Sequence, residues 1–280
     1  PADLVIRKTA CEKCDDEAKR KKATWRELRT WVHFVPFLML LYQRFVTFSR
    51  VTFSCHRAVA TETRAPGTRY ATVTMATAQA TKNNITLKGS TAIVTEFFGY
   101  AVNSILYQRG IYPPESFERK NKYGLGMLVT TDEQLKAYLV NILQQINDWM
   151  VQKTLQKLVL VVTAVGSHEV LERWVFDIVQ ESGVDGDGTA KVEKSDKEIQ
   201  TEISAIIRQI TASVTFLPLL EEACTFDLLV YTNDDAEVPV QWEESDARLI
   251  ETNEEQVKLR SFSTSVHKVE GSVSYKASED

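Results

Sequence analysis

The 280-residue chain has little cysteine, glycine or proline, and each shortage excludes a class of protein. Eleven glycines and seven prolines are too few for a collagen-like or low-complexity chain. Four cysteines exclude a disulfide scaffold, and only Cys224 follows Met75, so residues 75–280 are typical of an intracellular protein. What is present, 44% hydrophobic and 25% charged residues, is typical of one or two globular domains.

Charge is divided unevenly along the chain. Residues 1–74 carry 14 basic and 7 acidic side chains, a net of +7, whereas residues 75–280 carry 19 and 31, a net of −12. We therefore expect residues 1–74 to be an N-terminal extension, disordered or not native to the fold, and residues 75–280 to be the folded domain. Its acidic surplus argues against nucleic acid as a direct partner.

The extension contains two weak signals. The uncharged run Trp31–Gln43 has 13 residues and is interrupted by Pro36. It is shorter than the ~20 residues that a membrane-spanning helix needs, and the mixed charge before it does not fit a signal peptide. The pair Cys11 and Cys14 has zinc-knuckle spacing, but the only possible second ligand pair is Cys55-His56. A structural zinc site needs four well-spaced ligands, so we expect unpaired cysteines, no metal and no membrane partner.

Three segments of residues 75–280 have the apolar spacing of amphipathic helices. The first begins near Ser90 and should end at Gly110, which is followed by a Pro-Pro pair. The second and third open at Thr131 and Ser195. At each, a hydroxyl is followed three residues later by Gln or Glu, as in a capping box.

Four segments are predicted to be strands. Leu158–Thr163 is continuously apolar, as a strand buried on both faces would be. Val170–Val179 alternates and should pair with it as a hairpin, and Phe226–Thr232 is a third strand. Ser261–Val269 reads as one β-prone strand with weak alternation, so its register is weakly specified. It is either a plain edge strand or a segment that pairs in more than one way.

Motifs that would indicate catalysis are missing from residues 75–280. There is no phosphate-binding loop, dinucleotide fingerprint or HExxH pattern. His168 and His267 are the only histidines, and no basic residue next to Cys224 would activate its thiol. Acidic pairs are abundant but typical of a solvated surface. We expect no enzyme, no cofactor and no metal, which leaves a binding module.

Long strings in this part of the chain resemble the spindle checkpoint branch of the HORMA-domain family from about Met75 to Tyr275, and Met75-Ala-Thr resembles that family's own start. The strings are Ile85–Ser90, Glu96–Phe98, Asn103–Pro113, Lys122–Leu125, Leu128–Asp132, Glu169–Trp174, Phe176–Ile178, Ile207–Thr211, Val214–Glu221, Phe226–Leu229, Trp242–Ser245 and Leu259–Phe262.

The resemblance implies an α+β fold in which three helices pack on a mainly antiparallel sheet and a mobile C-terminal safety belt occupies about Glu237–Tyr275. It also implies two conformers, open and closed. In the closed conformer the belt crosses a bound peptide and locks it against a sheet edge. The last strand would then leave one edge and pair again on the other, which favours the second interpretation of Ser261–Val269.

The resemblance also assigns residues to sites. Trp149 would be the core residue that senses the change of conformer, and Arg208, Gln209 and Phe216 would lie at the interface of an open–closed dimer. The peptide-binding edge strand would comprise Phe226, Asp227, Leu228, Leu229, Val230 and Tyr231. The belt would include Trp242, Leu259, Phe262, Val266 and His267.

By the same resemblance the protein is a non-enzymatic adaptor that helps inhibit the anaphase-promoting complex and delays anaphase until chromosomes are attached. Its implied partners are the activator of that complex, the kinetochore coiled-coil adaptor, a BubR-type kinase complex, a second copy of itself, and a comet-type HORMA silencing protein with an AAA+ ATPase. Its implied locations are nucleus, cytoplasm, unattached kinetochores and spindle poles. The alternative is a HORMA adaptor of another pathway, a translesion polymerase subunit or a meiotic axis protein.

Overall fold

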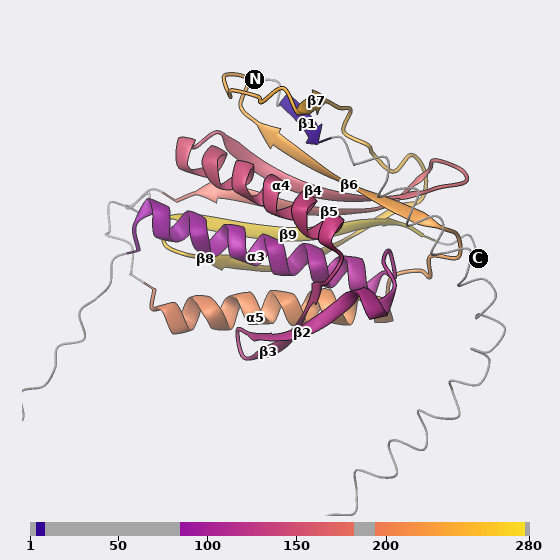
Figure 1. The fold of residues 1–280 in the computed structure, drawn as a ribbon, viewed down its shortest axis with the longest axis horizontal. Coiled ribbons are helices and arrows are strands. Elements are labelled where there is room, and N and C mark those ends of the chain that lie inside the picture. The colour runs from indigo at the N-terminus through magenta and orange to yellow at the C-terminus, as the bar shows by residue number, and fades with distance from the viewer. Residues whose placement is uncertain (1–3, 9–84, 182–193, 278–280) are drawn as a thin grey trace, which may run out of the picture. The chain divides into compact units, whose positions relative to one another are not determined.

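A computed structural model describes residues 4–8, 85–181 and 194–277 (Figure 1). The candidate membrane run, the Cys11/Cys14 pair and Met75 lie outside these residues. Within the described ranges no helix is long and apolar enough to cross a membrane. In the same ranges, His, Cys, Asp and Glu side chains nowhere form a group of three that could hold a metal ion.

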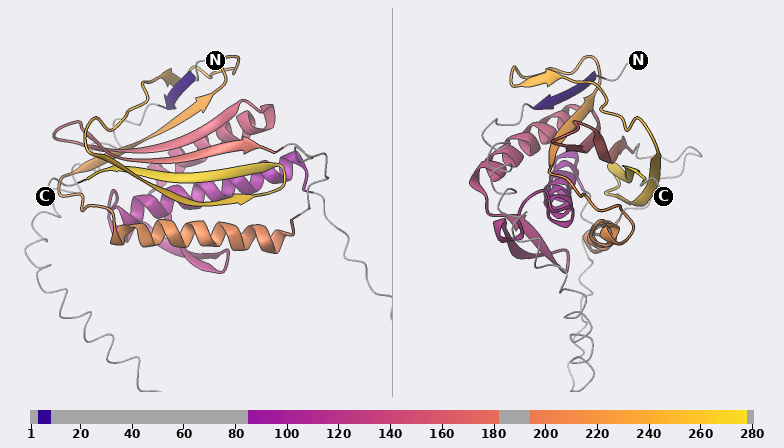
Figure 2. Two further views of the ribbon diagram at one scale, coloured as in Figure 1. Left: turned by 180° about the vertical axis from the view of Figure 1, so that it is seen from behind. Right: turned by 90° about the vertical axis from the view of Figure 1, so that its right-hand side faces the viewer.

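Three long helices lie together on one face of the sheet (Figure 2). Helix α3 spans Leu87–Gln108, α4 spans Glu133–Gln152 and α5 spans Asp196–Ala212. The expected start of α3 near Ser90 is three residues late, because the Thr86 hydroxyl caps the helix by accepting the Gly89 N–H at 3.1 Å. The expected stop at Gly110 is confirmed, since that residue has a φ of +62°.

The two capping predictions have different outcomes. At α5 the Ser195 capping box is confirmed, with Ser195 and Glu198 each accepting the other's backbone N–H. At α4 the prediction of Thr131 is wrong. The carboxylate of Asp132 caps this helix and accepts the N–H groups of Gln134 and Leu135 at 3.0 and 2.9 Å. An ionised acceptor is stronger than a hydroxyl and interacts favourably with the helix dipole.

The main sheet is antiparallel throughout and has the strand order β7-β1-β6-β4-β5-β9-β8. A separate hairpin, β2–β3, and the 3-10 turns η2 and η3 complete the fold. The bounds are β1 Leu4–Lys8, η2 Pro114–Ser116, β2 Phe117–Lys122, β3 Leu125–Thr130, β4 Leu155–Ala164, β5 Val170–Gln180, η3 Ser213–Thr215, β6 Cys224–Thr232, β7 Trp242–Glu244, β8 Glu254–Ser263 and β9 His267–Lys276.

The central strand β4 is buried on both faces, as predicted. Leu158, Leu160 and Val162 face the helices and belong to the main core. Val159 and Val161 face the other way and form a second, smaller cluster. The predicted β4–β5 hairpin is also confirmed. A continuous apolar run therefore marks the strand that has a layer on each side.

The prediction of one C-terminal strand over Ser261–Val269 is wrong. The segment is the end of β8, a turn and the start of β9, with Ser265 at a φ of +69°. The buried face of the segment is also well defined, because Phe262 and Val269 are fully buried and lie opposite each other in the β8–β9 pair. The Phe262 ring lies 4.9 Å from that of Phe97 on α3. Packing against α3 therefore fixes which face of the segment is buried, and the weak alternation in the sequence did not reveal this.

A buried ion pair joins the end of α3 to the sheet. Arg109 Nε donates to Glu172 Oε1 at 2.7 Å, and Trp174 Nε1 donates to Glu172 Oε2 at 3.0 Å. A second Arg109 nitrogen donates to the carbonyl of Pro218. Both charged side chains are almost wholly buried. Such a pair is tolerated in a core because neighbouring groups complete its hydrogen bonds.

Residues 1–74 were expected to lie outside the fold, but five of them do not. Strand β1 lies inside the main sheet, between β6 and β7. The composition of the extension did not reveal this, because the apolar run Leu4-Val5-Ile6 is short and the segment around it is basic.

Candidate peptide-binding edge

Strand β6 pairs on one side with β1, a strand from the distant N-terminal end of the chain. One side of β6 pairs with β4 along its whole length. The other side pairs with β1, so that Leu4, Val5, Ile6 and Arg7 lie opposite Thr232, Tyr231, Val230 and Leu229. Of the six predicted edge residues, Leu229, Val230 and Tyr231 face β1, whereas Phe226, Asp227 and Leu228 lie beyond its pairing.

Two aromatic residues hold the first part of the predicted belt. Trp149 on α4 is fully buried, and its Nε1 donates to the carbonyl of Glu237 at 3.1 Å. The ring of Trp242 on β7 packs edge-on against Trp149 with 4.9 Å between centroids. The residue assigned to sensing the conformer thus contacts the start of the belt directly.

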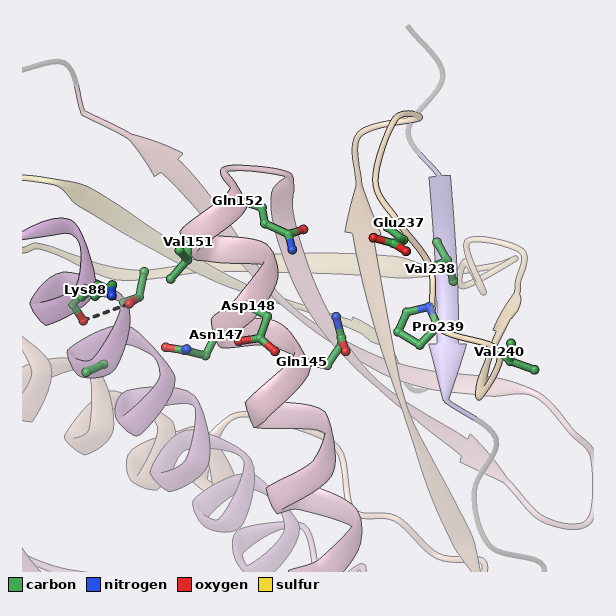
Figure 3. A pocket seen from close by; sticks show the side chains of 12 residues that line it. Lys88, Gln145, Asn147, Asp148, Val151, Gln152, Glu237, Val238, Pro239 and Val240 are labelled. Atoms are coloured by element: carbon green, nitrogen blue, oxygen red, sulfur yellow. Dashed lines mark hydrogen bonds between the residues drawn. The ribbon is translucent and has the colours of Figure 1, made fainter.

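A cavity of about 930 Å³ lies beside this junction (Figure 3). Its walls are the start of α3, the end of α4 and residues 237–240 of the belt, and charged side chains such as Lys88, Asp148 and Glu237 line it. Val240 is fully exposed here. One wall of this cavity belongs to the belt, so its shape depends on where the belt lies.

The middle of the belt crosses the sheet on the face away from the helices. The Ser245 N–H donates to the Val5 carbonyl at 2.9 Å, which ties the crossing segment to β1. Arg248 donates to the Thr163 hydroxyl at 3.2 Å and lies 3.8 Å from the Asp227 carboxylate. Ile250 then inserts into the second cluster. The crossing segment therefore covers β6 and β4.

The end of the belt, β8 and β9, forms the edge of the sheet opposite to β7 and β1. His267 is buried, and its Nδ1 lies 2.7 Å from the Ser90 hydroxyl on α3. The Thr264 hydroxyl accepts the His267 N–H at 3.0 Å. Burial lowers the pKa of His267, and Lys153 lowers it further, so the neutral ring is favoured.

Other belt residues pack less deeply than Phe262. Leu259 lies over Gly271, where any added Cβ would come within 3.2 Å of the leucine side chain. Val266 is half-buried at the β8–β9 turn. A larger residue at position 271 would therefore need Leu259 to shift by a few tenths of an ångström.

The predicted dimer residues are only partly at the surface. Arg208 is exposed and Phe216 is 41% exposed. Gln209 is half-buried against β8, where its Oε1 accepts the Arg260 N–H at 2.7 Å and its Nε2 lies 3.5 Å from the Lys258 carbonyl. The register of β8 shifts between Lys258 and Ser261, so Gln209 satisfies backbone groups that the irregular ladder leaves unpaired.

Sequence reasoning missed three contributors to this site: strand β1, Ile250 and Arg248. A signal existed for Arg248, which is the only basic residue between Val238 and Asn253 in an acidic stretch. For β1 the only signal was the short apolar run Leu4-Val5-Ile6, which does not reveal a partner strand more than 200 residues away.

This arrangement defines a class of protein, namely a helix-covered antiparallel sheet that holds an added strand beneath a C-terminal belt. A HORMA domain model matches residues 90–267. The mitotic spindle assembly checkpoint protein MAD2A of Dictyostelium discoideum is 61% identical over 206 residues, which are 74% of this chain and all of the relative. Human MAD2A is 55% identical over 70% of this chain and 94% of the relative.

Comparison with solved structures also gives matches of the same fold. A chain of a mitotic checkpoint complex is 51% identical with a TM-score of 0.62, covering 68% of this chain and 99% of that chain. The Caenorhabditis elegans protein HTP-1, solved with a HIM-3 closure motif, is 18% identical with a TM-score of 0.55 over 69% and 92%, a likeness of fold alone. The chain belongs to the HORMA-domain family, in its MAD2 branch of spindle checkpoint proteins.

The expected α+β HORMA fold and the function of a spindle checkpoint adaptor are thereby confirmed. The alternative pathways, translesion synthesis and the meiotic axis, are not favoured, since the relatives with high identity are checkpoint proteins.

Proposed function

We propose that the protein performs its checkpoint role by clamping an extended peptide between β6 and the belt. The observation that carries the proposal is the backbone pairing of β1 with Leu229–Thr232 of β6. Strand β7 pairs with the outer side of β1, and the belt segment that contains Ile250 crosses this part of the sheet. Backbone hydrogen bonds to such an edge provide affinity, and alternating side-chain pockets provide specificity. The arrangement corresponds to the closed conformer that the resemblance implied.

The proposed peptides belong to the activator of the anaphase-promoting complex and to the kinetochore coiled-coil adaptor. Capture of the activator, together with a BubR-type kinase complex, would inhibit the ligase. A comet-type HORMA protein and an AAA+ ATPase would return the belt to its open position. We place these steps at unattached kinetochores and spindle poles, and in nucleus and cytoplasm. Support comes from the 51% identity to a chain of the checkpoint complex.

We also propose that the role needs no catalysis and that it uses an open–closed dimer. The face for the dimer is the end of α5 and the turn after it, where Arg208 is exposed and Val214, Phe216 and Leu219 are 41%, 41% and 81% exposed. Exposed apolar side chains next to an arginine are typical of a protein interface.

The test is co-purification from dividing cells held in mitosis with a spindle poison. The tagged full chain should co-purify with the activator. The double variant Arg248→Ala/Ile250→Asp should lose most of it, because the crossing segment would no longer cover the edge. Val179→Asp alters a side chain that is 49% exposed on β5 and is the matched control. Equal recovery with all three chains would refute clamping by the belt.

A further inference from the structure

Strand β1 lies far outside the residues that the family model matches, which begin at residue 90. It nevertheless occupies the position in the sheet that we assign to a partner's peptide, between β6 and β7. In Figure 1 it is the indigo arrow beside β7 and β6. Any second strand added to this side of β6 would need the same backbone groups that β1 already uses.

Val5 and Ile6 of β1 pack on opposite faces of the sheet. Ile6 is fully buried in the main core, opposite the fully buried Val230. Val5 packs on the other face with the second cluster, opposite Tyr231. This alternation follows the pleat of the sheet. The strand is therefore seated by apolar packing as well as by backbone pairing.

The belt contacts β1 directly. The Val5 carbonyl accepts the Ser245 N–H at 2.9 Å, and Ile6, Arg7 and Lys8 lie opposite Glu244, Glu243 and Trp242 of β7. The Arg7 guanidinium lies 3.9 Å from the Glu243 carboxylate. The belt segment that would lock a partner's peptide is thus folded over the chain's own N-terminal segment.

We propose that Leu4–Lys8 is a ligand held in cis at the β6 edge, and that a partner's peptide is captured only when β1 leaves. The proposal rests on the proposed function, since it takes β6 to be the edge that receives peptides. It adds that β1 regulates the β6 edge by competing with a partner's peptide. A strand on the same chain competes at an effective concentration set by the tether, without depending on the concentration of the protein.

The first experiment tests the pairing and whether it is made within one chain. Val5→Cys and Tyr231→Cys are combined in the full chain, with Cys11, Cys14 and Cys55 changed to Ser. Residues opposite each other in an antiparallel pair have Cα atoms ~4.5–5.5 Å apart, within the range of a disulfide. Mild oxidation should link residues 5 and 231 within a monomer, as shown by non-reducing electrophoresis and peptide mass mapping.

The matched control pairs Arg7→Cys with Tyr231→Cys. This diagonal separation is ~7–8 Å, so little or no link should form. A dimer linked between residues 5 and 231 would overturn the proposal, because the strand would then come from a second copy. Absence of any link between these residues would overturn it too.

The second experiment measures occupancy of the edge. The probe is a fluorescent synthetic peptide of residues 1–10, titrated against the full chain and followed by anisotropy. Ile6→Asp should expel β1, because it would bury a charge, and the probe should then bind at least about tenfold more tightly than to the unchanged chain. The control Val140→Asp, at a residue 61% exposed on α4, should leave the affinity unchanged. Equal affinity for the unchanged chain and for Ile6→Asp, or no binding to either, would overturn the proposal.

These outcomes are separate from those of the proposed function. If the cross-link and the probe behave as expected but no activator co-purifies, the proposed function fails and the cis ligand stands. If the activator co-purifies and Ile6→Asp recovers no more of it than the unchanged chain, the regulation fails and the proposed function stands.

Discussion

The two ends of the main sheet are held in different ways. At one end β1 pairs with β6 over four residues and with β7 over three. At the other end β9 pairs with β5 from Glu172 to Gln180, and the hairpin that it forms with β8 packs against α5 and α3. Short pairing on one side and long pairing with a helix layer on the other mean that the strand at the β6 edge should exchange more easily.

The largest expected effect is at the strongly held end. Deleting residues 271–280 removes the second half of β9, including the buried Val273 and Tyr275. The lost burial of these two side chains alone is worth about 3–6 kcal/mol. We expect loss of the closed arrangement and of activator co-purification, and a clear fall in Tm.

Deleting only residues 278–280 is the matched control, because it leaves every described pair of β9 in place. Full activator recovery with the longer deletion would contradict the view that β9 holds the belt closed.

The second prediction compares one buried side chain from each end. Phe262→Ala should lower the free energy of unfolding by about 3–5 kcal/mol, because Phe262 is buried and packs against the ring of Phe97 on α3. Ile6→Ala should lower it by less than about 1 kcal/mol, although Ile6 is equally buried, since β1 can detach before the rest of the sheet unfolds. Urea denaturation of both variants measures this. Equal losses would mean that the two ends are held equally.

The third prediction concerns pH and the anchor of the β8–β9 turn. The pKa of His267 is lowered by burial, so below about pH 6.5 the unfolded chain binds a proton that the folded chain does not. Stability should therefore fall as pH drops below 6.5, by at most about 1.4 kcal/mol per pH unit from this residue.

The measurement is urea denaturation between pH 5 and 7.5 for the unchanged chain and for His267→Gln. The difference between their stabilities should shrink toward low pH. A difference that stays constant with pH would show that His267 does not titrate across this range.

The smallest expected effects separate Arg208 from Gln209. Gln209→Ala should cost about 1 kcal/mol, because it removes hydrogen bonds to the irregular part of β8. Arg208→Glu should change stability by less than about 0.5 kcal/mol, since this side chain is exposed, and should abolish dimerisation in analytical ultracentrifugation. A stable Arg208→Glu variant that still dimerises would remove the α5 face from the proposed interface.

Local patterns predicted the parts of the fold that depend on neighbours in sequence. The capping box at Ser195 and the doubly buried β4 are examples. The errors occurred where a stronger neighbouring acceptor or a tertiary contact decided the local structure. Asp132 replaced Thr131 as the cap because a carboxylate is the better acceptor. The turn between β8 and β9 has no glycine, proline or asparagine, and its bonds from Thr264 and His267 to Ser90 on α3 are tertiary.

The candidate site divides in the same way. The resemblance to the HORMA family assigned the β6 edge, Trp149 and the belt, because it carries residue roles of that family over to matching positions in this chain, and these assignments stay predictions. It said nothing of what occupies the edge, nor that Gln209 makes hydrogen bonds to the backbone of β8.

The amino-acid sequence by itself determined the family, the three helices, the central strands and the division of charge at Met75. Only the tertiary structure decided that Leu4–Lys8 leaves the basic extension and joins the acidic domain's sheet. The physical reason is that an open strand edge offers its N–H and C=O groups to any extended segment that fits the pleat. Which segment fits depends on the pockets around Val230 and Tyr231, and these exist only once the helices and the belt have packed.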